Sequence, residues 1–88
     1  MEVSEVADNT KLYGTSWCPH THRSRDIMDR TNMEYTWYDI DEDKDACAFV
    51  EKVNEGNRSV PTIVFPDGTI LVEPDDSELI SKCRDFSK

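Results

Sequence analysis

A single cysteine at the predicted start of a helix is the group in this chain best suited to chemistry. Cys18 follows the short apolar run 11–14 and immediately precedes Pro19, a residue that favours the first turn of a helix. A cysteine at this point lies beside unpaired backbone N–H groups and the positive end of the helix dipole, which favour the thiolate. Because the thiolate is the nucleophile, the position of Cys18 predicts thiol–disulfide chemistry.

Thr21 occupies the position at which a two-cysteine redox motif would carry its second sulfur. Its backbone N–H or its hydroxyl could donate a hydrogen bond to the Cys18 thiolate. Alternatively, Thr21 simply replaces a lost cysteine as an ordinary helix-start residue. Both interpretations exclude a local dithiol–disulfide cycle, so the motif predicts a monothiol reaction.

His20 lies between the proline and the threonine of this motif. As an imidazolium it would place positive charge beside the sulfur and favour the thiolate; alternatively its ring points into solvent. We favour the electrostatic role. His22 is expected at the surface, and we predict no metal site, since His20 and His22 have poor helical spacing and no third ligand.

The composition predicts one small domain and excludes several classes of partner. The 88 residues are 36% apolar and 33% charged, which requires a compact core, and the net charge of −9 argues against nucleic acid. No apolar run approaches a membrane span, and residues 1–5 lack the basic and apolar regions of a signal peptide. We therefore expect a cytoplasmic protein without a membrane partner.

Apolar periodicity predicts the order strand, helix, strand, helix, strand, strand, helix. The strands are expected at residues 11–13, 35–40, 60–65 and 69–72, and the helices at 19–30, between the acidic cap 41–45 and the stop at 55–56, and at 74–86. The first crossover predicts a parallel strand pair, and the 66–68 turn predicts an antiparallel hairpin. We expect an α/β fold with a four-stranded mixed sheet flanked by three helices, in a domain of residues 10–88 after a flexible tail, 1–9.

The other two cysteines are expected to be structural. Cys47 and Cys83 fall on the second and third predicted helices, and Cys83 continues an inward row that also contains Leu79, Ile80 and Phe86. Buried thiols of this kind are inert. The two helices should cover opposite faces of the sheet, so we predict no disulfide between Cys47 and Cys83.

The element order and two motifs resemble the glutaredoxin branch of the thioredoxin fold. The motifs are Ser16-Trp17-Cys18-Pro19 after the first strand and Ser59-Val60-Pro61 before the third. The resemblance spans about residues 10–86, and the run 57–62 with the turn Asp67-Gly68 looks most like mycoredoxins, actinobacterial relatives that use mycothiol. It implies a thioredoxin-like fold and a low-molecular-weight thiol as co-substrate, with no bound cofactor.

The resemblance also implies which residues would bind the small thiol. Pro61 matches the cis-proline of the family, and the Val60 backbone would pair with the peptide-like part of the thiol. Arg58 matches a basic position near the carboxylate of the bound thiol, and Asp76 lies where relatives have an acidic residue. Trp17 is either a substrate platform or a packed anchor of the loop.

Two departures from the family pattern bear on the function. Glutathione-specific members have a glycine pair in the segment that corresponds to residues 72–77, and this chain has none there, which favours mycothiol or another small thiol. Iron–sulfur-carrying relatives have Cys-Gly-Phe-Ser, whereas this chain has Cys-Pro-His-Thr, which argues against a cluster carrier. On the first predicted helix Arg23 and Arg25 align with basic residues of the family; for these two and for Arg58, a solvated surface role is an equal alternative.

We therefore expect a monomeric, monothiol glutaredoxin-like oxidoreductase that reduces mixed disulfides between client proteins and a small thiol, mycothiol or glutathione, through Cys18. A thioredoxin-fold module that binds a partner without turnover is the alternative from a different class. An iron–sulfur cluster carrier is a third, less favoured one.

Overall fold

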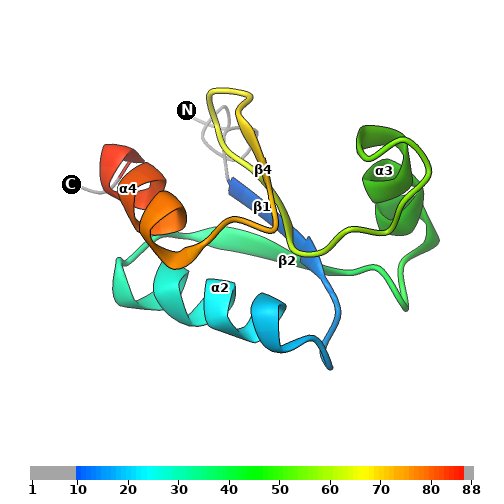
Figure 1. Cartoon of the computed structure of the whole chain (residues 1–88), viewed down its shortest axis with the longest axis horizontal. Helices are drawn as coiled ribbons and strands as arrows, with labels where there is room; N and C mark the ends of the chain where they lie inside the picture. The colour runs from blue at the N-terminus through cyan, green and yellow to red at the C-terminus, as the bar shows by residue number, and fades with distance from the viewer. Residues whose placement is uncertain (1–9, 87–88) are drawn as a thin grey trace, which may run out of the picture.

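The computed structural model describes residues 10–86, with the side chain of Phe86 excepted. The flexible tail expected at residues 1–9 and the inward position expected for the Phe86 side chain lie outside the described part. The elements follow in the predicted order (Figure 1): β1 (Thr10–Gly14), α2 (Pro19–Arg30), β2 (Tyr35–Asp39), α3 (Lys44–Val53), β3 (Thr62–Val64), β4 (Ile70–Val72) and α4 (Asp76–Phe86).

The four strands form one mixed sheet in the order β2-β1-β3-β4. β1 and β2 are parallel, with Gly14 opposite Asp39, whereas β3 runs antiparallel to both β1 and β4. This confirms the parallel crossover and the hairpin. β3 is shorter than the predicted 60–65 because Pro61 has no N–H to donate and the Phe65 N–H donates to the Thr69 carbonyl within the turn.

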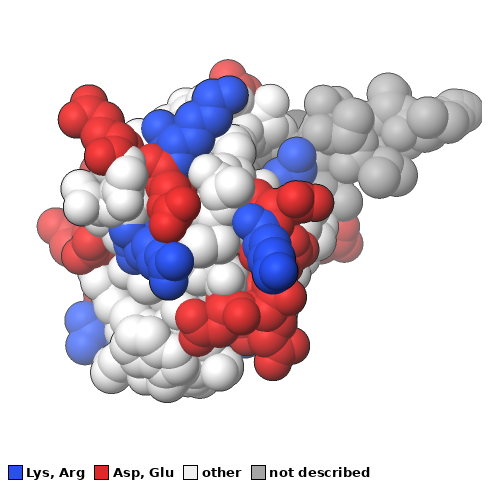
Figure 2. All heavy atoms as spheres, turned by 90° about the vertical axis from the view of Figure 1, so that its right-hand side faces the viewer, with Lys and Arg blue, Asp and Glu red and all other residues white. Residues whose placement is uncertain are grey.

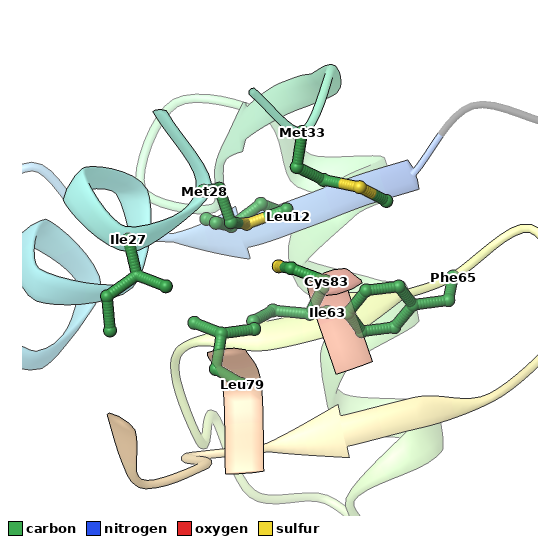
Figure 3. Packing of buried hydrophobic residues seen from close by; sticks show 8 residues of the cluster. All are labelled: Leu12, Ile27, Met28, Met33, Ile63, Phe65, Leu79 and Cys83. Atoms are coloured by element: carbon green, nitrogen blue, oxygen red, sulfur yellow. The ribbon is translucent and has the colours of Figure 1, made fainter. Parts of the chain in front are cut away.

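Helices cover both faces of the sheet, as predicted. On one face α2 and α4 pack together over a cluster that contains Leu12, Ile27, Met28, Met33, Ile63, Phe65, Leu79 and Cys83 (Figure 3). On the other face α3 covers a smaller cluster of Tyr13, Ile40, Ala46 and Val50. The two clusters together form the core that holds the end of β1 and the start of α2 in place.

The two structural cysteines lie on opposite faces, and both are free thiols. Cys83 is fully buried as expected, and this burial raises the pKa of its thiol. The prediction that Cys47 is buried was wrong. It is half-buried, because α3 presents it to a surface pocket that Arg58 also lines.

The β3–β4 turn is held against α4 by a charged pair. Asp67 accepts hydrogen bonds from the Thr69 N–H at 2.9 Å and from the Lys82 ammonium at 3.0 Å. These bonds lower the pKa of the Asp67 carboxyl to about 2, with the backbone hydrogen bond from Thr69 as the largest cause. Within the described residues, no helix is long and apolar enough to cross a membrane.

Candidate active site

Cys18 is the N-cap residue of α2. Its backbone is extended, with φ −85° and ψ 119°, and Pro19 occupies the first turn as predicted. The Cys18 side chain is half-buried and makes no capping hydrogen bond, at the end of α2 where the first backbone N–H groups have no partner within the helix. The geometry is that of an accessible nucleophile next to a helix N-terminus.

Thr21 lies on the buried side of the first turn of α2. It is fully buried, and its hydroxyl has no hydrogen-bond partner, so the expected bond to Cys18 is not formed by this hydroxyl. The side chain instead packs against Gly14, where an added Cβ would lie 2.6 Å from Thr21 Cγ2. The absence of a side chain at Gly14 therefore lets the first turn of α2 lie close to the end of β1.

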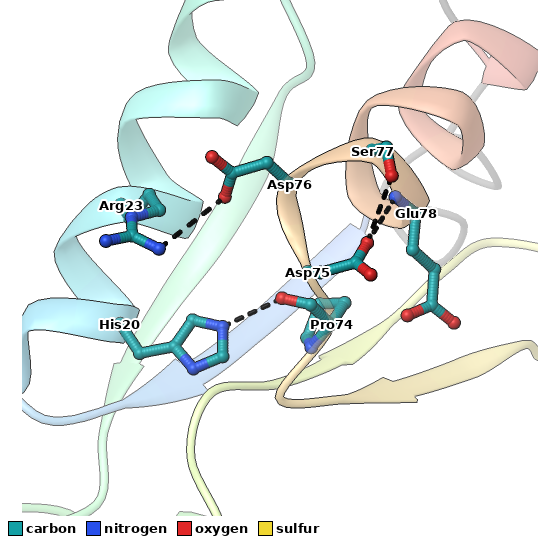
Figure 4. Close-up of polar contacts among 7 residues, drawn as sticks. All are labelled: His20, Arg23, Pro74, Asp75, Asp76, Ser77 and Glu78. Carbon is teal, nitrogen blue, oxygen red and sulfur yellow. Dashed lines mark hydrogen bonds and ion pairs between the residues drawn. The ribbon is translucent and has the colours of Figure 1, made fainter.

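His20 connects the first turn of α2 to the segment that precedes α4. Its Nε2 lies 2.8 Å from the Pro74 carbonyl oxygen (Figure 4), and since a carbonyl only accepts, this nitrogen carries the proton. The ring is half-buried, so the alternative in which it simply points into solvent was wrong. His22 is exposed as predicted, and its Nε2 bonds the Ser16 carbonyl oxygen.

An acidic pocket of about 570 Å³ lies next to His20. Asp76 lines it and forms an exposed ion pair with Arg23, 4.0 Å between Asp76 Oδ1 and the guanidinium (Figure 4). The remaining lining residues are Glu73, Asp75 and Ser77. Asp75 Oδ1 also accepts the Glu78 N–H at 2.8 Å, which caps the start of α4.

Trp17 lies on the other side of Cys18 and is 69% exposed. Its indole Nε1 donates a hydrogen bond of 2.7 Å to Asp41 Oδ2, so the ring is exposed yet held in one orientation. The sequence analysis missed Asp41. It lies two residues beyond the end of β2, at the same edge as the end of β1, and the parallel register of these strands is the signal that could have identified it.

The peptide bond between Val60 and Pro61 is cis, as the resemblance implied. The Pro61 carbonyl accepts the Glu73 N–H at 2.8 Å, which connects the start of β3 to the segment before α4. Glu73 has a φ of 50°, in the left-handed region where glycine is the favoured residue. Glu73 lies within the segment 72–77, where glutathione-specific relatives have a glycine pair and this chain has none.

Arg58 is paired with an acidic residue that sequence reasoning also missed. Its Nε donates a hydrogen bond of 2.9 Å to Glu51 Oε2 on α3, and this bond is the main cause that raises the pKa of Arg58. Glu51 lies on α3 and Arg58 lies beyond the end of this helix, so helical periodicity does not indicate the contact. Arg25, in contrast, has a structural contact, because its guanidinium lies 4.2 Å from the centre of the Trp37 ring.

Among residues 10–86 no group of three or more His, Cys, Asp or Glu side chains could hold a metal ion. The candidate site contains one accessible thiol at a helix N-terminus, a pocket that His20 lines, and a second pocket that Asp41, the partner of Trp17, lines. The family model that describes glutaredoxins matches residues 10–70 of this chain. The chain belongs to the glutaredoxin family.

A relative in sequence agrees with this assignment, and two solved structures agree with the fold. This glutaredoxin is 39% identical over 74 residues to mycoredoxin 1 of Corynebacterium glutamicum, a match that covers 84% of this chain and 91% of mycoredoxin 1. A glutaredoxin structure from Archaeoglobus fulgidus superposes with a TM-score of 0.69 at 24% identity and covers 92% of both chains. A structure of a thioredoxin-like protein superposes with a TM-score of 0.71 at 20% identity, over 85% of this chain and 99% of that chain.

The comparisons confirm the predicted fold class and the resemblance to mycoredoxins. As a mycoredoxin-like glutaredoxin, the protein is a thiol–disulfide oxidoreductase. Its co-substrate is a low-molecular-weight thiol, and its clients are proteins that carry disulfides.

Proposed function

We propose that this glutaredoxin works by a monothiol mechanism through Cys18. The Cys18 thiolate attacks the small-thiol sulfur of a mixed disulfide, Prot–S–S–R, and the client leaves as a thiolate that takes up a proton. The enzyme then carries Cys18–S–S–R. A second small thiol attacks this bond as its thiolate, releases R–S–S–R and regenerates Cys18, so each turnover consumes one free small thiol and joins it to the R–S group taken from the client.

The observation that carries this proposal is the isolation of the Cys18 thiol. The position at which a two-cysteine motif would have its second cysteine holds Thr21, and the other two cysteines of the chain lie on α3 and α4. Cys83 is fully buried under one face of the sheet, while Cys47 packs beside the cluster on the other face. A cycle that needs no second protein thiol fits this arrangement.

We further propose mycothiol as the small thiol rather than glutathione. The segment before α4 lacks the glycine pair of glutathione-specific relatives, and carboxylates from Glu73, Asp75 and Asp76 surround it. An anionic end of a thiol would meet like charges there. In this proposal Trp17, Val60, Pro61, Arg58 and Asp76 bind the small thiol, while Pro19, His20 and Thr21 shape the helix start around Cys18. The protein acts as a monomer in the cytoplasm.

Single substitutions of the three cysteines test the mechanism. Turnover of a mycothiol mixed disulfide should be abolished in Cys18→Ser, because the hydroxyl is not a nucleophile toward disulfides. Cys47→Ser should keep turnover close to wild type, and Cys83→Ser should do so as far as it remains folded. Loss of turnover in a folded Cys47→Ser protein would indicate a distant resolving thiol and contradict the monothiol cycle. A wild-type protein whose Cys18 binds a client protein but shows no turnover would instead indicate a binding module.

A further inference from the structure

A second pocket lies beside the active-site loop, on the side opposite His20. It has a volume of about 310 Å³ and is lined by Ile40, Asp41, Lys44, Cys47, Ala48, Glu51 and Arg58. Asp41 connects this pocket to the loop, since it accepts the hydrogen bond from Trp17, the residue before Cys18. This hydrogen bond joins the active-site loop to the edge of the pocket.

The pocket is lined by equal numbers of cationic and acidic side chains. Lys44 and Arg58 supply two cations, and Asp41 and Glu51 supply two carboxylates. Arg58 is exposed, and its guanidinium is held 2.9 Å from Glu51 Oε2. Figure 2 shows the same intermixing of basic and acidic side chains over the side of the molecule on which α3 lies. Arg58, the cation expected to contact an anionic ligand, thus already has the Glu51 carboxylate beside it.

We propose that Glu51 is a specificity-determining residue, which offsets the charge of Arg58 and disfavours small thiols that carry a carboxylate at this end. The inference rests on the proposed function, in which Arg58 lies beside the thiol bound to Cys18. It extends that function by naming the chemical class that the pocket accepts. That class is a small thiol whose end at Arg58 is uncharged and hydrogen-bonding, such as an amide or a polyol.

The physical reason is that a carboxylate able to contact Arg58 must also approach Glu51. Two like charges about 4 Å apart in water repel each other by an energy that corresponds to roughly a fivefold change in an equilibrium or rate constant. An uncharged end of the thiol does not experience this repulsion and can still accept a hydrogen bond from the guanidinium. Removal of the Glu51 charge should therefore favour the carboxylate selectively.

Two disulfides that differ only at the carboxylate test this directly. The reduced full-length protein is mixed with equal amounts of glutathione disulfide and the disulfide of glutathione monoethyl ester, in which the glycine carboxylate is blocked. Intact mass spectrometry then gives the ratio of the two Cys18 adducts at early times. Because both disulfides compete for the same thiol, this ratio does not depend on the concentration of the protein.

In Glu51→Gln we expect the ratio of carboxylate adduct to ester adduct to rise about fivefold at low salt. Glu34→Gln is the matched control, since it removes one exposed carboxylate before β2, outside this pocket, and should leave the ratio unchanged. Adding Arg58→Gln to Glu51→Gln should cancel the gain, because the cation is then absent.

An unchanged ratio in Glu51→Gln, or an equal rise in Glu34→Gln, would overturn the role of Glu51 and leave the proposed function intact. A wild-type protein whose Cys18 reacts with neither disulfide, nor with mycothiol disulfide, would overturn the proposed function itself and this inference with it.

Discussion

At the scale of single residues, the first two residues of the Cys-Pro-His-Thr motif differ from the last two in how well the sequence predicted their surroundings. Cys18 and Pro19 have the positions that the sequence predicted, at the N-cap and first turn of α2. The Thr21 hydroxyl makes no hydrogen bond to the sulfur, which was one of the two alternatives that the sequence left open for this residue. His20 hydrogen-bonds the Pro74 carbonyl, and Thr21 packs against Gly14. Local spacing identified the nucleophile. It could not identify the partner of His20, which lies 54 positions away in the sequence, or that of Thr21, which lies at the end of β1.

The hydrogen bond between Trp17 and Asp41 leads to a prediction at the same scale. In Asp41→Ala the exposed indole loses the acceptor that holds it, so we expect its rotational freedom to increase and the reaction of Cys18 with a mixed disulfide to slow. The free energy of unfolding should change by less than about 0.5 kcal/mol, because the pair is exposed.

Fluorescence anisotropy in a Trp37→Phe background measures this, since Trp17 is then the remaining tryptophan of the two in the chain. Asp41→Asn serves as the control, because its amide oxygen can still accept the bond. An unaltered anisotropy in Asp41→Ala would show that the hydrogen bond does not orient the ring.

At the scale of helices and strands, the sequence predicted the order and type of each element because apolar periodicity reports which face is buried. It also predicted helices on both faces of the sheet, with the helices that carry Cys47 and Cys83 on opposite faces. What it could not predict is how completely each helix is covered. Cys47 is expected to be a buried thiol, yet α3 leaves it half-exposed in a pocket that Arg58 also lines. The sequence also did not predict the pairs Glu51–Arg58 and Trp17–Asp41. They depend on how separate elements pack together, and apolar periodicity gives no information on that.

The turn between β3 and β4 provides a test of how this hairpin is attached to α4. The pKa of Asp67 in the folded protein is lowered to about 2, below the value of about 3.9 for an unfolded chain. The carboxylate therefore stabilises the fold above pH 4, and its contribution is lost as the pH falls from about 4 to about 2.

We expect Asp67→Asn to be less stable than wild type at pH 7 and the difference to vanish near pH 2. Urea unfolding of both proteins at several pH values measures this. A difference in stability that stays constant down to pH 2 would mean that the charge of Asp67 does not contribute to holding the turn.

At the scale of the whole molecule, the thiol lies between two pockets of different character. On one side His20 borders an acidic pocket with Asp76, and on the other Trp17 reaches Asp41 at the edge of a charge-balanced pocket with Arg58. The chain has a net charge of −9, and basic and acidic side chains intermix on the face shown in Figure 2. This arrangement fits a small thiol with few or no carboxylates better than a strongly anionic one.

The central claim is that Cys18 alone exchanges with a small thiol. The most direct measurement mixes the reduced protein with oxidised mycothiol and, separately, with oxidised glutathione, and determines the intact mass and the modified residue. We predict a single adduct on Cys18, formed more readily with mycothiol and removed by the matching reduced thiol. A protein that instead forms an internal disulfide with Cys47, or whose Cys18 remains free with both disulfides, would contradict the account.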